Sequence, residues 1–145
     1  MKKVTLLCFA IMCTAMMAWA QNTDMQEISA DKLPKFSIGI INSYFPGAKV
    51  VTAMKEKSKI RNAYDVELDN GVRCEFDKDG QWTMVDAGEE LIPDRMVPGK
   101  IVMYMSKIGY KSPVQRMQKD KKGNYTISLR DGTELHFDNQ FRVVE

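Results

Sequence analysis

The spacing of apolar residues divides most of this 145-residue chain into helix and strand patterns. From Leu33 onward apolar residues recur at steps of three and four, the spacing of one helix face, and Pro46-Gly47 ends this pattern. Alternation with a period of two follows, broken by turn signals such as Asp69-Asn70-Gly71. The pattern predicts one helix and then four antiparallel strands, at residues 48–57, 63–68, 72–76 and 82–85.

The same succession occurs a second time. Val97 and Pro98 open a shorter helix, and strands are expected at residues 113–119, 125–129, 133–137 and 141–144. The segment from Tyr64 to Asp77 recurs 61 positions later, from Tyr125 to Asp138. Because similarity at a fixed spacing is typical of repeated folding units, the sequence predicts a tandem repeat.

The alignment of the two copies also predicts which positions are equivalent. It takes Phe141 as the nearest equivalent of Trp82, and it treats the turn that starts at Asp138 as two residues shorter than the turn that starts at Asp77. In the first strands it pairs Val51 with Val114 and Met54 with Met117.

The expected fold class is α+β, a tandem repeat of a helix plus a four-stranded antiparallel sheet. A single copy of roughly 55 residues buries only a marginal core, so two copies that share a core are expected, with the helices over the apolar sheet faces. The sequence leaves open whether the two sheets are continuous. The expected parts are a signal peptide at 1–20, a flexible leader at 21–32, and repeats at 33–90 and 91–145.

The first 20 residues have the composition of a secretory signal. Lys2 and Lys3 precede an apolar run, which ends at Ala18-Trp19-Ala20. We therefore expect a periplasmic or secreted protein, without membrane insertion once the signal is removed. Removal of Lys2 and Lys3 leaves 19 basic and 19 acidic residues. This neutral balance gives no electrostatic case for nucleic acid or an anionic membrane surface as a partner.

Residues with catalytic or metal-binding chemistry are few. His136 is the only histidine and is expected to point outward from a strand, and Cys74, the only cysteine beyond the signal, aligns with Leu135 and is expected to be buried. Asp77 to Gly80 resembles the start of a calcium loop but lacks the later ligands, which favours a hairpin turn. The sequence therefore predicts neither an enzyme nor a metal or cofactor site.

Alternation in the predicted strands leaves a polar face on the sheet, and this face is the candidate surface for binding a partner. Its residues come from both copies. They are Asp65, Glu67, Arg73, Glu75, Thr126, Ser128, Glu134, His136 and Arg142.

Several short motifs resemble the PepSY-like family of exported bacterial proteins, which is also described as β-lactamase-inhibitor-like. The motifs are Leu33-Pro34, Tyr44-Phe45-Pro46-Gly47-Ala48, Tyr64-x-Val66-x-Leu68-x-x-Gly71 and Phe76-Asp77-x-x-Gly80. The resemblance implies a tandem-repeat fold similar to the β-lactamase inhibitory protein, with a concave sheet surface that grips another protein. The second copy departs from the pattern, because Tyr110-Lys111-Ser112-Pro113 replaces the Phe-Pro-Gly-Ala motif and Asp138 to Phe141 has no glycine.

The function expected from these observations is a non-enzymatic exported binding module, acting as inhibitor or escort of an envelope or secreted enzyme through its polar sheet faces. The alternative is a carrier or sensor of a small ligand, with a pocket between helix and sheet. The sequence identifies neither the partner protein nor the oligomeric state.

Overall fold

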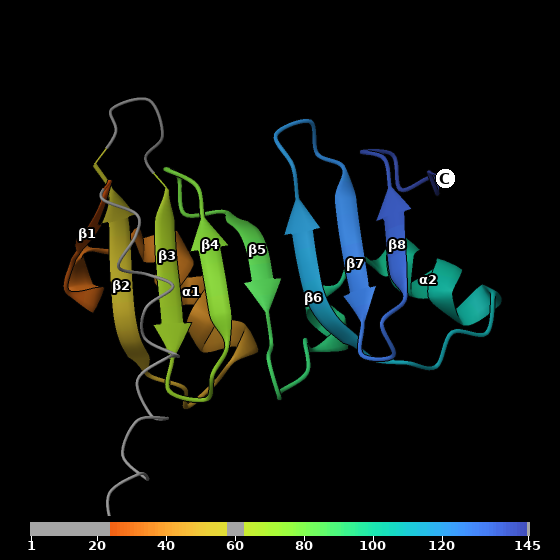
Figure 1. Ribbon diagram of the computed structural model, residues 1–145, viewed down its shortest axis with the longest axis horizontal. Coiled ribbons are helices and arrows are strands. Elements are labelled where there is room, and N and C mark those ends of the chain that lie inside the picture. The colour runs from red at the N-terminus through yellow and green to blue at the C-terminus, as the bar shows by residue number, and fades with distance from the viewer. Residues whose placement is uncertain (1–23, 58–62, 145) are drawn as a thin grey trace, which may run out of the picture.

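The structure, a computed structural model, describes residues 24–57 and 63–144, so the expected signal peptide at 1–20 lies outside the described residues. The described part contains one antiparallel sheet of eight strands, whose order in the sheet is their order in the chain. Figure 1 shows α1 behind β2 to β4, and α2 behind and beyond β8, so both helices lie on the same side of the sheet. The strands are β1 (Met25–Glu27), β2 (Val50–Glu56), β3 (Tyr64–Leu68), β4 (Arg73–Phe76), β5 (Trp82–Asp86), β6 (Val114–Lys119), β7 (Tyr125–Leu129) and β8 (Glu134–Phe137), and the helices are α1 (Lys35–Tyr44) and α2 (Gly99–Lys107), with short 3-10 turns η1 (Ala30–Lys32) and η2 (Asp94–Met96).

Both helices use the apolar spacing seen in the sequence to face the sheet. Ile40 and Ile41 of α1 are buried, as are Ile101 and Met105 of α2, one turn apart. Each helix follows a proline that has extended backbone, which suits the first turn because proline has no N–H to leave unpaired. The expected helix starts at Leu33 and Val97 are confirmed within two residues.

The hydrophobic core lies between the helices and one face of the sheet. Tyr64, Val66 and Leu68 of β3 are buried, while the residues between them are only half-buried. Buried side chains of both helices and of β2 to β8 form one continuous cluster. Cys74 is 1% exposed within this cluster, and burial raises the pKa of its thiol to about 12, which confirms the expected buried cysteine.

The sheet is continuous across the middle of the chain, which settles the point that the sequence left open. β5 and β6 pair through Met84↔Gln118, Val85↔Met117 and Asp86↔Arg116. Val85 and Met117 are fully buried in the core beneath this junction. The α+β class and the antiparallel sheet are thus confirmed, but as a single sheet of eight strands.

Pairing registers correct the alignment in the first strands. Val114 pairs with Leu129 as Val50 pairs with Leu68, and Met117 pairs with Ile127 as Ala53 pairs with Val66. The equivalents of Val114 and Met117 are therefore Val50 and Ala53, one residue before the expected Val51 and Met54. Each ladder contains a bulge, between Val50 and Thr52 and between Val114 and Arg116. The extra residue of a bulge shifts the alternation of buried and exposed positions by one, and the sequence pattern does not show this shift.

The turn after β8 also differs from the expectation. Asp77 Oδ1 accepts hydrogen bonds from the backbone N–H groups two and four residues later, and Asp138 Oδ1 does the same. The two turns therefore have equal length, and Phe141 occupies the position of Gly80, with φ of 64° against 84°. The equivalent of Trp82 is Val143 rather than Phe141, because Val143 bridges Phe137 as Trp82 pairs with Phe76.

Two expected elements have different forms. The leader at 21–32 was expected to be flexible, yet Met25–Glu27 forms β1 and Ala30–Lys32 forms η1. β1 was missed because its residues carry no apolar alternation, and the strand is held by its ladder to β2. The strand expected at 141–144 is reduced, within the described residues, to the isolated bridge between Phe137 and Val143.

Candidate binding face

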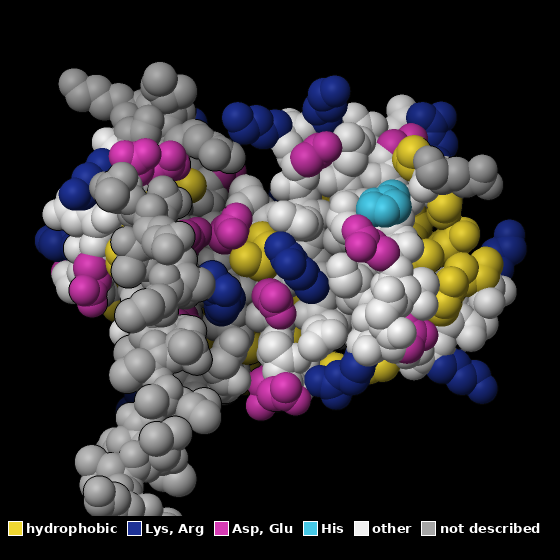
Figure 2. Space-filling view, viewed as in Figure 1, with side chains coloured by type: hydrophobic (Ala, Val, Ile, Leu, Met, Phe, Trp, Pro, Cys, Tyr) yellow, Lys and Arg dark blue, Asp and Glu magenta, His cyan; other side chains and the backbone are white. Residues whose placement is uncertain are grey.

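The sheet face opposite α1 and α2, called here the open face, carries the polar residues of the alternating strands. No helix of the described residues covers it (Figure 1). Figure 2 shows acidic and basic side chains next to one another in the middle of this face, over β4 to β6. The open face is therefore a polar surface to which neighbouring strands of the sheet contribute charged side chains of both signs.

One row of directly opposed residues crosses seven of the strands with charges of mixed sign. Opposed residues on neighbouring strands have Cβ atoms about 5 Å apart, so their side chains interact. Arg73 lies between Glu67 and Asp86, and Asp86 is in turn opposed to Arg116. The row, from β2 to β8, is Thr52, Glu67, Arg73, Asp86, Arg116, Ser128 and Glu134.

A second row holds two opposed carboxylates. Asp65 on β3 faces Glu75 on β4, and both are half-buried. Burial and the neighbouring Glu75 carboxylate raise the pKa of Asp65 to about 6, against the lowering effect of Arg73. The row, from β1 to β8, is Glu27, Met54, Asp65, Glu75, Met84, Gln118, Thr126 and His136.

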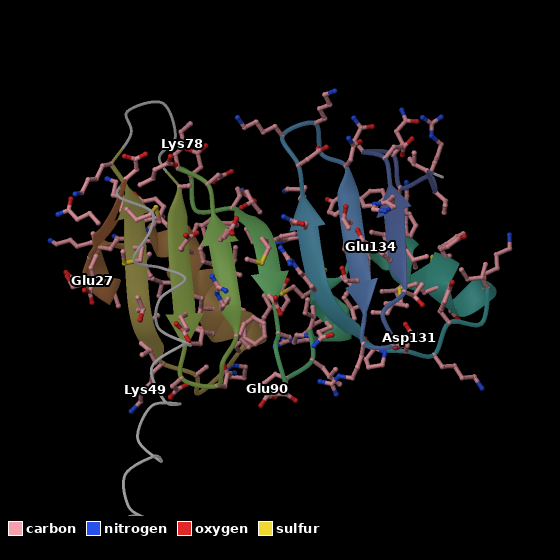
Figure 3. All side chains as sticks on the ribbon, in the orientation of Figure 1. Glu27, Lys49, Lys78, Glu90, Asp131 and Glu134 are labelled. Atoms are coloured by element: carbon pink, nitrogen blue, oxygen red, sulfur yellow. The ribbon has the colours of Figure 1, made fainter. Side chains whose placement is uncertain are left out.

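The end of the open face on β7 and β8 brings three polar side chains together. His136 Nδ1 lies 3.3 Å from Thr126 Oγ1, and His136 Nε2 lies 3.6 Å from Glu134 Oε1. The side chains of His136 and Glu134 are 52% and 53% exposed, and Figure 3 shows Glu134 on the side of the sheet that faces the viewer. This arrangement can exchange hydrogen bonds with a partner. It does not enclose a substrate, because both side chains stand in solvent.

Eight of the nine residues expected on the polar face lie on it, from β3, β4, β7 and β8. The ninth, Arg142, lies in the turn after β8, where its Nε donates to Asp138 Oδ2 at 2.6 Å. It was misplaced because Asp138 to Phe141 has no glycine to mark the turn.

Sequence reasoning missed the central residues of the open face. Asp86 and Arg116 lie on it next to the buried Val85 and Met117, so alternation around those two residues could have found them. They were missed because the sequence did not show that β5 pairs with β6. Met84 is also on this face but only 5% exposed. It follows a bulge between β4 and β5, which no sequence signal marks.

The surface of the described residues has a hollow beside β6 and another between residues 44–48 and the loop after β5. The larger, with a volume of about 1070 Å³, is lined by the turn at 77–79 and by the β6–β7 hairpin, including Lys121, Lys122 and Asn124. The smaller, of about 500 Å³, is lined by residues 44–48 and 90–91 together with Asp69. Both are wide surface depressions at the ends of strands rather than enclosed chambers.

The aspartates of the acidic turns accept hydrogen bonds from their own backbone. Asp77 Oδ1 is occupied by the N–H groups of Asp79 and Gln81, as expected for a hairpin turn. Across residues 24–57 and 63–144, no group of three or more histidine, cysteine, aspartate or glutamate side chains is placed to hold a metal ion. Nor does any helix in this part of the chain have the length and apolar character needed to cross a membrane.

Solved structures that resemble this chain include two proteins from Bacteroides vulgatus and one from Bacteroides thetaiotaomicron. The first, described as a "putative periplasmic protein from DUF2874 family" of B. vulgatus, is 32% identical with a TM-score of 0.80, over 86% of this chain and 97% of that one. The second, a "putative calcium-regulated periplasmic protein" of B. thetaiotaomicron, is 30% identical with a TM-score of 0.78, over 84% and 95%. The third, a "putative periplasmic protein of unknown function" of B. vulgatus, is 25% identical with a TM-score of 0.77, over 83% and 97%.

Comparison by sequence gives a family but no curated relative. No curated protein matches the chain. Residues 62–145 match the family model described as "Putative beta-lactamase-inhibitor-like, PepSY-like". This match covers more than half of the chain and includes β3 to β8. The chain therefore belongs to the PepSY-like family.

Proposed function

We propose that this protein is a non-enzymatic, exported binding module that uses its open face to bind another protein, as an inhibitor or escort of an envelope or secreted enzyme. The observation that carries the proposal is the open face itself, where two rows of opposed, mostly polar residues cross the sheet. Mixed charges in a fixed geometry suit recognition of a complementary protein surface, since they select the partner and its orientation.

The family and the relatives support the location and the class of activity. The family description is inhibitor-like, and the similar Bacteroides proteins are described as periplasmic. We infer that residues 1–20 direct export of this chain to the same compartment.

We also infer that the two halves arose by duplication. The β3–β4 and β7–β8 ladders have the same register 61 residues apart, with Tyr64↔Phe76 matched by Tyr125↔Phe137. A bulge occurs at the same place in β2–β3 and in β6–β7. Duplication gives the protein a face twice as wide as one unit could offer.

The small-ligand alternative has less support. It requires a pocket between helix and sheet, yet Ile41 of α1 and Ile101 of α2 pack with strand residues such as Val66 and Val85 in one continuous cluster. Of the two hollows described above, the larger lies at the β6–β7 hairpin, and the smaller is an open depression beside the end of α1 and the turn at 69–70.

The proposal is tested with charge reversals on the open face. The variant combines Glu67→Lys, Asp86→Lys and Glu134→Lys, which lie on β3, β5 and β8 and reverse the acidic groups of one row. A matched control carries Asp31→Lys and Asp94→Lys, exposed acids of η1 and η2 that lie outside the sheet. Circular dichroism and urea unfolding establish that both variants fold.

The measurement is capture of partners from envelope extract on the immobilised secreted form, residues 21–145, followed by titration of the captured protein. We expect wild type and control to bind the same protein with similar affinity. The open-face variant should bind about tenfold or more weakly, since reversal of close charge pairs weakens interfaces by more than 1.4 kcal/mol. Equal binding by all three proteins would contradict the proposed face.

A further inference from the structure

α2 exposes apolar side chains to solvent in addition to those that it buries in the core. Ile101 and Met105 point into the core, while Met103 on the opposite side is 73% exposed and Val102 is 36% exposed. The apolar surface continues beyond the helix with Ile108, 44% exposed, and Tyr110. Isolated exposed hydrophobic residues are common, but four within nine residues form a surface that needs an explanation.

The charged residues of the segment that carries this apolar surface all have one sign. Residues 99–111 contain three lysines and no arginine, aspartate or glutamate. Lys100, Lys107 and Lys111 are all exposed and border the apolar residues. Figure 2 shows hydrophobic side chains gathered at the right-hand end of the molecule, where β8 and α2 lie, between lysine and arginine side chains.

The acidic side chain of the β7–β8 turn is bonded within that turn. Asp131, at the β7–β8 turn, receives no bond from the lysines in the structure: its N–H donates to Ser112 Oγ, and its Oδ1 accepts from the Thr133 N–H. Lys100, Lys107 and Lys111 form no ion pair with an acidic side chain of the described residues. Lys100 has in addition a position over the Phe141 ring, 5.5 Å from its centroid.

We propose that this α2 surface, made of Lys100, Val102, Met103, Lys107, Ile108, Tyr110 and Lys111, binds the surface of a membrane that contains anionic phospholipid. Apolar side chains flanked by lysines fit the boundary between head groups and acyl chains, because the lysine stems extend along the apolar layer while their charges remain among the phosphates. The helix has nine residues, about 13 Å in length, so the contact is shallow and lies in the plane of the membrane.

The overall neutrality of the secreted chain does not oppose this binding. At physiological salt a charge is screened beyond about 8 Å, so a membrane responds to the nearest groups rather than to the sum over the molecule. A second copy of the chain fits this surface poorly, because a symmetric contact would place the lysines of one copy against those of the other. The surface is on α2, away from the open face, so the inference does not depend on the proposed function.

α1 provides an internal control for the same kind of helix. It lies on the same side of the sheet and exposes one large apolar residue, Phe36, which is 53% exposed. Its other outward residues include Asn42 and Ser43, and its single lysine is Lys35. A general affinity of exposed helix surfaces for lipid would therefore affect both helices, whereas the proposal concerns α2 alone.

The first experiment places an environment-sensitive fluorophore on a single cysteine in residues 21–145. Met103→Cys gives an exposed thiol, while Cys74 is 1% exposed with its pKa raised to about 12, and so does not react in the folded protein. Phe36→Cys is the matched control on α1. With vesicles of phosphatidylcholine and phosphatidylglycerol we expect a blue shift at position 103 and none at 36, and with phosphatidylcholine alone no shift at either.

The second experiment measures vesicle co-sedimentation of charge variants without a label. Each lysine near an anionic surface contributes about a fivefold increase in binding, so Lys107→Glu with Lys111→Glu should weaken binding by more than about tenfold. Lys35→Glu on α1 should leave binding unchanged.

Three results would overturn the inference: no binding to phosphatidylglycerol vesicles at low salt, equal binding to neutral vesicles, or an equal loss with Lys35→Glu. Binding of poly-glutamate without binding to vesicles would also overturn it, and would assign the surface to an acidic protein.

Discussion

Replacement of Gly80 by alanine tests how closely α1 is held against the turn between β4 and β5. Gly80 has a φ of 84°, and a Cβ there would lie 2.8 Å from Pro34 Cβ and 2.9 Å from Ser37 Oγ. Ser37 is fully buried, and its hydroxyl donates to the Gly80 carbonyl oxygen at 3.2 Å. An alanine must therefore displace the first turn of α1 and weaken a buried hydrogen bond.

The expected loss has two parts that a control can separate. Left-handed backbone costs a non-glycine residue about 1 to 2 kcal/mol. Disturbance of the Ser37 hydrogen bond adds about 1 to 3 kcal/mol, so Gly80→Ala should lower the free energy of unfolding by about 2 to 5 kcal/mol. Gly71→Ala carries only the first part, because Gly71 has a φ of 85° but no atom within 4 Å of the added Cβ.

Urea unfolding of the two variants and the wild type, followed by circular dichroism, measures both parts. We expect the midpoint to fall for both variants and further for Gly80→Ala, with an unchanged dependence on urea. If Gly80→Ala loses no more stability than Gly71→Ala, the contact between α1 and the turn contributes nothing, and our account of this packing is wrong.

Two further predictions concern the open face and the core. The native pKa of Asp65, about 6, is above its unfolded value of 3.8, so ionisation of Asp65 lowers the stability of the protein as pH rises from about 4 through 6. The free energy of unfolding of Asp65→Asn should equal that of wild type near pH 4. Near pH 7 it should be higher by about 1 to 2 kcal/mol, after allowance for solvent screening, as measured by urea unfolding at each pH. A variant no more stable than wild type near pH 7 would contradict the assigned burial. Met117→Ala should lower the free energy of unfolding by about 2 to 5 kcal/mol, because Met117 is fully buried. Val51 is 62% exposed, so Val51→Thr should change it by less than about 0.5 kcal/mol. If thermal unfolding shows similar losses for the two variants, the corrected register is wrong.

Residues with strong local preferences were predictable from sequence. The alternation of Tyr64, Val66 and Leu68, with Asn70-Gly71 after it, predicted β3 and its turn into β4, because period-two burial and a glycine with positive φ have few other structural explanations. The same alternation placed His136 on the polar face, where the structure has it.

The missed features depend on contacts between segments. The ladder that holds Met25–Glu27 as β1 runs to β2, more than 25 residues later in the chain. Bulges displaced the alignment of β2 with β6 by one residue. Phe141 has a positive φ, which glycine usually adopts, so the sequence did not mark this turn. Phe141 is accommodated by stacking on Tyr125, with ring centroids 5.3 Å apart, a contact that only the fold creates.

The agreement between strand order and chain order has a consequence for how the protein folds. Every ladder joins strands that are consecutive in the chain, and the longest connection, from Asp86 to Val114, contains α2. Contacts close in sequence form with a small loss of loop entropy, and proteins rich in them fold quickly. A chain that emerges gradually, from a ribosome or from a translocation pore, can add one strand at a time to a growing edge without waiting for its last residues.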